Sequence, residues 1–569
     1  MFSPPMVTMK QYEQERSLHF PGLHLVLPAF VTRLPLTLVL ASQYAIPSPC
    51  GNYIASVTQQ HLYIQWTGSL APAYTFPLDG LQTKNAAETS TIQWSASSMH
   101  VILLASQAVH LFSILDSAQK IHISNGSGSL GKIIAVEIIG NPGQEQAVVV
   151  FEFGRVKFWD LSTGRSTEVG DAKMGGRGNP WTVRKVSGKT EVLALLSRVA
   201  AQDVLSLFLS NSTTPLQSVT LPSVDAQSIS WSPCGQWLAV FDSSLASPSV
   251  YILTADGYLF RSYPPRLEAT PPNTPGTDEY SLGLGFRSMA WTPSALALCG
   301  AQTITLLDRR IFSFKATMSI HNSCSGSTNL SPAAYGYQET LTSTNARSYT
   351  YLTGTSLPRP SSKIAIMDPR ASPNGAFLAT RDESALSTIT IWSLEQPKMH
   401  ITLQQHAAVR KMLWHPERAN LLLILSDDGS LYLWDVGSGD APVYLQHAFS
   451  GREDVGRIDA RWVATSTAHA EGDVERKLAI VVTSRKSGWQ VLWPEGREAV
   501  ESLEGDVSQD SLYDILTGRT PLPGDKTRDV DDDSTRISAT GLDDTFRDKA
   551  GAQVQDRSLV ELQDDSEIF

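Results

Sequence analysis

The stretch ITLQQHAAVRKMLWHPERANLLLILSDDGSLYLWDVG, residues 401–437, decides the fold. It contains a continuous apolar run from Leu421 to Leu425, a tight turn at 427–429, and an alternating strand that closes on Trp434 and Asp435. A continuous apolar run is typical of a strand that is covered on both faces. The stretch therefore predicts an antiparallel sheet of about 40 residues that needs neighbours of the same kind to bury its faces.

The same landmarks recur along the chain and indicate a repeat architecture. Several units open with Trp, then Ser, Thr or His, then Pro or Ala, at Trp94, Trp231, Trp291 and Trp414. Others close on a tryptophan, at Trp159, Trp392 and Trp434. The last two closing residues are 42 positions apart, the length of one blade of a WD40-type β-propeller.

Nine units follow from these landmarks. They lie at residues 48–66, 92–116, 133–169, 181–219, 226–263, 286–320, 363–403, 409–445 and 458–496. Propellers commonly have four to eight blades, so the nine units form either one large ring or a ring with one or two units outside it. We therefore predict an all-β, WD40-type β-propeller of seven to nine blades over residues 45–496.

Three segments interrupt or flank this propeller. Residues 1–44 form an N-terminal extension, of which 17–40 could supply a ring-closing strand although its prolines disfavour one. Residues 262–280 are rich in Pro and Thr; Thr270 and Thr274, each followed by Pro, are candidate phosphorylation sites, or simply turn-forming residues. The polar insertion 321–362 predicts a long loop projecting from one face.

Acidic charge is concentrated at the C-terminal end. Residues 497–569 hold 19 acidic and 8 basic side chains, whereas the rest of the chain holds 37 of each. The tail is predicted to be disordered and solvated, although the segment 511–524 could dock into a partner groove as a short helix. A neutral body predicts no nucleic acid and no anionic membrane as partners.

The cysteines and the N-terminal region bear on the cellular compartment. The cysteine usage indicates reduced thiols. Four scattered cysteines predict neither a disulfide framework nor a metal site: Cys50, Cys234, Cys299 and Cys324. The apolar segment 23–41 is broken by Pro28, Arg33 and Pro35, and is too short for a membrane helix. Charges and prolines occupy the place where a signal peptide needs an apolar core. We expect a protein that is neither secreted nor membrane-spanning.

Two motifs resemble catalytic or nucleotide-binding sites. His406, Ser426 and Asp428 are the residue types of a hydrolase triad, but with Trp434 they also match the structural hydrogen-bond network of a blade, which is the interpretation we favour. The segment GSGSLGK, 126–132, lacks the hydroxyl residue and the helix of a P-loop, since Ile133 opens a β-like run. We predict no catalytic, cofactor-binding or metal-binding residue, no cofactor and no small-molecule substrate.

The best-formed units resemble a known family. The segments KIAIMDPRASPNGAFLATRDESALSTITIWSLEQ (363–396), VRKMLWHPERANLLLILSDDGSLYLWDV (409–436) and EYSLGLGFRSMAWTPSALALCG (279–300) are similar to the WD repeat-containing protein 8 family of centrosomes and spindle pole bodies. The apolar stretch through Ala41 and the acidic tail depart from that family.

The resemblance implies a non-catalytic adaptor in the cytoplasm and cytoskeleton, at the spindle pole body or another microtubule-organising centre. It implies two partners, a coiled-coil spindle-anchoring protein and, in fungi, a minus-end-directed kinesin. With them, the protein would hold microtubule minus ends and support spindle assembly in mitosis. A WD40 substrate receptor of a ubiquitin ligase is the alternative function.

Overall fold

The computed structural model describes the greater part of the chain up to Glu495. The described residues are 44–58, 60–78, 91–104, 108–115, 120–124, 131–140, 144–176, 178–186, 190–210, 212–243, 249–263, 286–300, 303–319, 335–342, 346–353, 366–450, 457–464, 478–484 and 487–495. Every regular element within these ranges is a β-strand. The chain divides into two units, Met1–Arg497 and Glu498–Phe569, and the second lies outside the described residues.

Nine sheets follow one another along the first unit, and each corresponds to one of the nine predicted repeats. Blade one contains β1 (Tyr44–Pro47), β2 (Tyr53–Val57), β3 (His61–Trp66) and β4 (Pro72–Pro77). Blade two contains β5 (Thr91–Trp94), β6 (His100–Leu104), β7 (Ala108–Ser113) and β8 (Lys120–Ser124). Blade three contains β9 (Ile133–Ile139), β10 (Gln146–Phe151), β11 (Arg155–Asp160) and β12 (Ser166–Asp171).

The next three blades repeat this four-stranded antiparallel order. Blade four contains β13 (Trp181–Arg184), β14 (Val192–Val199), β15 (Gln202–Leu209) and β16 (Gln217–Thr220). Blade five contains β17 (Ala226–Trp231), β18 (Trp237–Asp242), β19 (Val250–Thr254) and β20 (Leu259–Tyr263). Blade six contains β21 (Ser288–Trp291), β22 (Ala295–Cys299), β23 (Thr303–Asp308) and β24 (Phe314–Ser319).

The last three blades differ in strand number. Blade seven contains β27 (Ile366–Ala371), β28 (Phe377–Asp382), β29 (Thr388–Ser393) and β30 (Lys398–Gln404), and is extended by β25 (Tyr335–Leu341) and β26 (Arg347–Thr353). Blade eight contains β31 (Val409–Trp414), β32 (Leu421–Ser426), β33 (Leu431–Asp435) and β34 (Val443–Leu445). Blade nine contains β35 (Ile458–Trp462), β36 (Ile480–Ser484) and β37 (Gly488–Leu492) in the described part of the chain.

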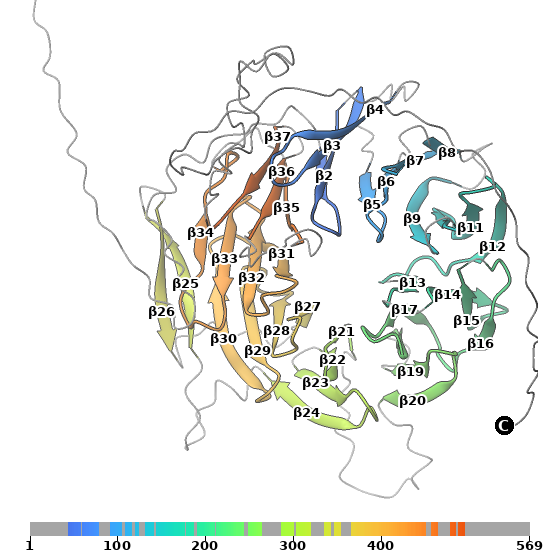
Figure 1. Ribbon diagram of the computed structural model, residues 1–569. Coiled ribbons are helices and arrows are strands. Elements are labelled where there is room, and N and C mark those ends of the chain that lie inside the picture. Colours follow the sequence, from blue (N-terminus) through green and yellow to red (C-terminus); the bar gives the residue numbers. More distant parts are fainter. Residues whose placement is uncertain are drawn as a thin grey trace, which may run out of the picture. The chain divides into compact units, whose positions relative to one another are not determined.

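The nine blades close into one ring (Figure 1). A separate buried apolar cluster joins each blade to the next, from blades one and two through to blades eight and nine. A further cluster packs Ala45 and Ile54 of blade one against Val481 and Trp489 of blade nine. The fold is therefore a nine-bladed β-propeller, and the prediction of an all-β, WD40-type propeller is confirmed.

The apolar runs of the sequence occupy the middle of the blades. All six residues of β32 are buried, and so are five of the six residues of β10. Each of these strands has a neighbouring blade on both faces, so both sets of alternating side chains leave water. The first strand of each blade is the innermost, since β1 lies against β5 and β35, and β27 against β21 and β31 (Figure 1).

Turns of the type Ser-Pro-x-Gly set the entry into the second strand. In blade one, the Ser48 hydroxyl accepts a hydrogen bond from the Tyr53 backbone N–H at 3.1 Å, and Gly51 has a φ of +78°. A Cβ at Gly51 would lie 1.7 Å from the carbonyl oxygen of Ala464, which follows β35 of blade nine. Glycine is thus required here for its backbone conformation and for close approach across the ring closure.

The polar insertion, predicted to be a projecting loop, contains ordered secondary structure. β25 and β26 form an antiparallel hairpin, and β25 pairs in parallel with β30, aligning Tyr335 with Ile401 and Gln338 with Gln404. Both strands, YGYQETL and RSYTYLT, contain Tyr and Thr, which are enriched in β-strands, but their polar composition obscured this signal in the sequence. The insertion thus widens blade seven at its outer edge.

Several sequence predictions fall outside the described residues and are not tested by the fold. These are the ring-closing strand at 17–40, the phosphorylation sites Thr270 and Thr274, the loop 126–130, Cys324, and the acidic tail with its segment 511–524.

Candidate functional site

The four residues of the predicted blade network bond to other partners. The Ser426 hydroxyl is completely buried and donates to Oε1 of Gln405 at 2.8 Å. The Trp434 indole donates to the carbonyl of Asp440 at 2.9 Å. His406 is exposed, and its backbone N–H donates to Oε2 of Glu339 at 3.0 Å. Gln405, one position before His406, thus occupies the place beside the serine, and the arrangement is not that of a hydrolase triad.

Blade seven contains a buried bond of the kind expected in blade eight. The Trp392 indole donates to Oγ1 of Thr380 at 2.8 Å, and both side chains are buried. Thr380 and Trp392 lie on the adjacent strands β28 and β29, so this bond fixes one sheet internally. The sequence had identified Trp392 and Trp434 as closing tryptophans, but it placed this bond in blade eight, and the structure has it in blade seven.

Asp428 belongs to a charged cluster that fastens the inserted hairpin to blade eight. Arg347 of β26 donates to Oε1 of Glu339 at 2.7 Å and to Oδ2 of Asp428 at 3.3 Å. The Tyr432 hydroxyl also donates to Oε1 of Glu339 at 2.7 Å, and the Arg347 guanidinium lies 4.7 Å from the ring centre of Tyr444. This arrangement stabilises the hairpin, because the completely buried Glu339 carboxylate needs both a charge partner and hydrogen-bond donors.

Electrostatics within this cluster keep the Asp428 carboxylate charged and the Tyr432 hydroxyl neutral. Burial acts to raise the pKa of Asp428, but hydrogen bonds from Ser430 and Arg347 outweigh it and hold the pKa below its ordinary value. Burial and the neighbouring Glu339 carboxylate raise the pKa of Tyr432, so this tyrosine remains a neutral hydrogen-bond donor. The donors and acceptors of the cluster bind one another, so the cluster serves to attach the hairpin to blade eight.

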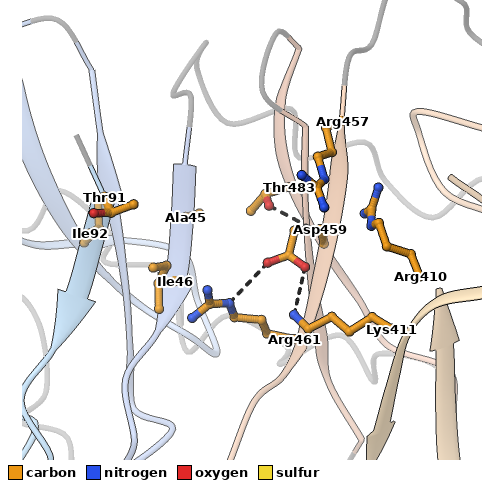
Figure 2. Close-up of a pocket in the computed structure, with 10 residues that line it drawn as sticks. All are labelled: Ala45, Ile46, Thr91, Ile92, Arg410, Lys411, Arg457, Asp459, Arg461 and Thr483. Atoms are coloured by element: carbon orange, nitrogen blue, oxygen red, sulfur yellow. Dashed lines mark hydrogen bonds and ion pairs between the residues drawn. The ribbon is translucent and has the colours of Figure 1, made fainter. Parts of the chain in front are cut away.

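A second polar region faces the inside of the ring, in a cavity of about 350 Å³ between the innermost strands of four blades (Figure 2). Its walls come from the innermost strands of blades one, two, eight and nine, together with one residue of β36. The lining residues are Ala45, Ile46, Thr91, Ile92, Arg410, Lys411, Arg457, Asp459, Arg461 and Thr483. We call this space the central cavity. Four of its side chains are cationic and one is a carboxylate.

Asp459 is held by two of the four cations. Lys411 of β31 donates to Oδ1 of Asp459 at 2.8 Å and to the carbonyl of Ala460 at 3.1 Å. Nε of Arg461 donates to Oδ2 of the same carboxylate at 3.4 Å (Figure 2). Burial acts to raise the pKa of Asp459, but Lys411 and Arg461 lower it below its ordinary value. The single carboxylate is therefore charged and already paired.

The other two cations have no such partner in the described part of the chain. Neither the Arg410 nor the Arg457 guanidinium lies within hydrogen-bond or ion-pair distance of a carboxylate in these ranges. Burial lowers the pKa of Arg410 and the like charge of Arg457 lowers it further, which together outweigh the opposing effect of the Asp459 and Asp427 carboxylates. Both remain protonated, because arginine does not lose its proton in proteins. Among its described lining residues, the central cavity therefore presents four cations and one carboxylate beside the apolar side chains of Ala45 and Ile92.

This site was missed in the sequence although part of its signal is visible there. Asp459 and Arg461 alternate along β35 and Arg457 directly precedes it at the same spacing, so the three share a face. The intervening Ile458 and Ala460 pack against blade eight. The other two cations come from β31, which precedes β35 in the chain by a whole blade. Equal numbers of acids and bases in residues 1–496 concealed a local excess of positive charge.

Metal-binding and membrane-spanning features are the remaining sequence predictions that the described residues address. Cys50, Cys234 and Cys299 are free thiols, and no group of three or more potential metal ligands occurs in the ranges given above. No helix of sufficient length and hydropathy to cross a membrane is found in these ranges.

The chain is similar to WD repeat-containing proteins. It is 26% identical over 401 residues to the Schizosaccharomyces pombe protein named uncharacterized WD repeat-containing protein C32H8.09, covering 67% of this chain and 76% of that protein. It is 24% identical over 440 residues to the mouse WD repeat-containing protein WRAP73, covering 70% and 87%. No protein-family model matches the chain.

Solved structures are matched at lower similarity. A crystal structure of the eukaryotic initiation factor aligns with a TM-score of 0.44 and 13% identity, covering 72% of this chain and 88% of the other. The C-terminal WD40 domain of Sif2 aligns with a TM-score of 0.38 and 9% identity, covering 68% and 95%.

Proposed function

We propose that this protein is a non-catalytic scaffold of the microtubule-organising centre, where it anchors microtubule minus ends and supports spindle assembly through partner proteins. The observation that carries the scaffold function is the closed ring of nine blades, with Ser426 buried away from solvent and the Arg347 cluster committed to structure. Such a ring holds several surfaces and loops in fixed positions, so several partners can be bound at once without chemistry.

The proposed location rests on the sequence resemblance. The segments 279–300, 363–396 and 409–436 resemble the centrosomal and spindle-pole family. They contain two strands of blade six (β21 and β22), three of blade seven (β27 to β29) and three of blade eight (β31 to β33). The proposed partners are a coiled-coil spindle-anchoring protein and a minus-end-directed kinesin, and the proposed location is the cytoplasmic spindle pole body. Similarity to WD repeat-containing proteins of fission yeast and mouse supports the scaffold class.

Localisation in dividing cells tests this function. A fluorescently tagged full-length chain should concentrate at spindle poles in mitosis, and affinity purification from mitotic cells should recover a coiled-coil pole protein. A tagged chain that complements a deletion but is evenly distributed in mitotic cells would refute the proposed location.

The second candidate is a substrate receptor of a ubiquitin ligase. The positively charged central cavity favours it, since such a receptor must hold a short motif of its substrate. A cullin adaptor recovered in place of a pole protein would support this function over the first.

A further inference from the structure

The central cavity is accessible to a ligand from solvent. Thr91, Arg457 and Arg461 are exposed, whereas Ala45 and Ile92 are buried against the neighbouring blades. The space thus has a charged, solvated side and an apolar side. Charged hydrogen bonds gain strength where low-dielectric walls exclude part of the water.

Several donors in the central cavity form no hydrogen bond with the residues that the structure describes. Lys411 uses two of its three N–H donors, on Asp459 and on the Ala460 carbonyl. Arg461 uses Nε on Asp459, and no hydrogen bond within the described ranges engages the terminal nitrogens of Arg410 or Arg457. The side chains that could receive a ligand therefore come from two adjacent blades.

Arg410 and Arg457 repel each other as long as the site is empty. Both line the central cavity, Arg410 from β31 and Arg457 from the position directly before β35, and the buried residues of these strands fix them in the ring. A small anion placed between two guanidiniums relieves this repulsion, and a phosphate oxygen fork matches the planar donors of arginine. Since Asp459 neutralises only one of four cations, a dianion suits the site better than a single carboxylate.

We propose that the central cavity binds the phosphate group of a phosphorylated serine or threonine in a partner protein, with Arg410 and Arg457 as its principal ligands. This proposal rests on the scaffold function and specifies the chemistry of one partner. A cavity of about 350 Å³ accommodates one compact anionic group rather than a row of carboxylates on separate side chains. Residues 1–496 as a whole hold 37 acidic and 37 basic side chains, a balance that does not favour an extended basic track for nucleic acid.

The test uses three peptide libraries of identical degenerate flanks, with phosphoserine, serine or glutamate at the central position. Each library is passed over immobilised full-length protein, and the bound peptides are quantified by mass spectrometry. We expect the phosphoserine library to be retained at least about tenfold more than either of the others, with retention falling as salt is raised.

The variant Arg410→Gln/Arg457→Gln should lose this preference. Its matched control is Arg165→Gln/Arg310→Gln, which removes the same charge from exposed positions beyond β11 and β23 and should retain the phosphopeptides. If the first double variant melts at a lower temperature than the wild-type protein, the single exposed variant Arg457→Gln replaces it.

Three results would overturn the proposal: equal retention of the phosphoserine and glutamate libraries, equal loss of binding in the control variant, or a single-stranded oligonucleotide bound with the same dependence on Arg410 and Arg457. The result is separable from that of the localisation experiment. If the protein binds phosphopeptides but is absent from spindle poles, the phosphate site stands and the proposed location fails. If the protein lies at the poles but binds no phosphopeptide, the phosphate site fails and the proposed location stands.

Discussion

Trp462 donates its indole N–H to the backbone carbonyl of Leu413 at 3.0 Å, which joins the innermost strand of blade nine to that of blade eight. The same type of bond links three other pairs of successive blades, from Trp94 to Ile46, Trp291 to Ser230, and Trp414 to Arg370. In these four blades, the tryptophan near the start of the repeat thus fastens the blade to the preceding one.

Replacing Trp462 by Phe should therefore weaken the ring. The substitution keeps an aromatic side chain but leaves the Leu413 carbonyl without its donor, at a cost of about 1 to 2 kcal/mol in the free energy of unfolding. Urea denaturation followed by circular dichroism measures this. Trp66→Phe, at a tryptophan that is 45% exposed, is the matched control and should change stability by less than about 0.5 kcal/mol. Equal effects of the two substitutions would contradict a role for the Trp462 bond.

Gly51→Ala should disrupt the contact between blades one and nine. A methyl group there would lie 1.7 Å from the Ala464 carbonyl oxygen, on a backbone with a φ of +78°. We expect a loss of more than about 2 kcal/mol in unfolding free energy. At Gly68 a Cβ meets no atom within 4 Å, so Gly68→Ala should be nearly neutral in the same denaturation experiment. A wild-type melting temperature for Gly51→Ala would show that blades one and nine are not in contact as described.

Arg347→Gln should release the inserted hairpin from blade eight. It leaves the buried Glu339 carboxylate without its charge partner, which typically costs about 3 kcal/mol or more. Amide hydrogen exchange should accelerate in β25 and β26 more than in blade nine. The double variant Glu339→Gln/Arg347→Gln removes both charges and should recover part of the protection.

The matched control for that experiment is Arg155→Gln, which breaks an exposed pair with Glu168. It should change stability by less than about 1 kcal/mol. Unchanged exchange in β25 and β26 of the Arg347→Gln variant would mean that backbone pairing with β30 alone retains the hairpin.

Ser426→Ala should behave as a folding mutation. It leaves Oε1 of the buried Gln405 without a donor, and we expect a loss of about 1 to 3 kcal/mol in unfolding free energy. Ser162→Ala removes an exposed hydroxyl and should have little effect. Loss of any enzymatic activity in Ser426→Ala at an unchanged melting temperature would instead support the hydrolase interpretation.

His415 should make the protein less stable in mild acid. Burial lowers the pKa of its imidazole to about 4, and the neutral ring accepts hydrogen bonds at Nδ1 from the backbone N–H groups of Glu417 and Arg418. Because the folded-state pKa is lower than that of the unfolded chain, the unfolded state gains the proton first as the pH falls below about 6.5. This histidine therefore favours unfolding progressively between about pH 6.5 and pH 4, by about 2 kcal/mol at pH 5.

His415→Asn tests that contribution, since an amide oxygen can accept similar hydrogen bonds but does not titrate in this range. The decrease in unfolding free energy between pH 7 and pH 5 should be smaller in the variant than in the wild-type protein. His61→Asn, at a less buried histidine on β3, provides the comparison. An identical decrease in the His415→Asn variant would assign the acid sensitivity to other groups.

The nine repeat units and their order could be predicted from the sequence because their signals are local, whereas the number of blades in the ring was predicted only as seven to nine. The Leu421–Leu425 run, the glycine turns and the spacing of Trp392 and Trp434 each lie within one repeat, and a repeat that cannot bury its own faces requires neighbours. The hairpin in the insertion was missed, because its pairing with β30 joins segments about 65 residues apart and its polar strands lack an apolar alternation.

By itself, the sequence determined the all-β propeller, its nine units, and the tryptophans and glycines that define them. Only the tertiary structure decided which side chains come together: Ser426 with Gln405, Arg347 with Asp428, and Arg410 and Arg457 around one cavity. The physical reason is that strand periodicity sets the face of a side chain but not the residue opposite it. Ring closure sets that partner, and it gathers the cations of blades eight and nine against blades one and two in the central cavity.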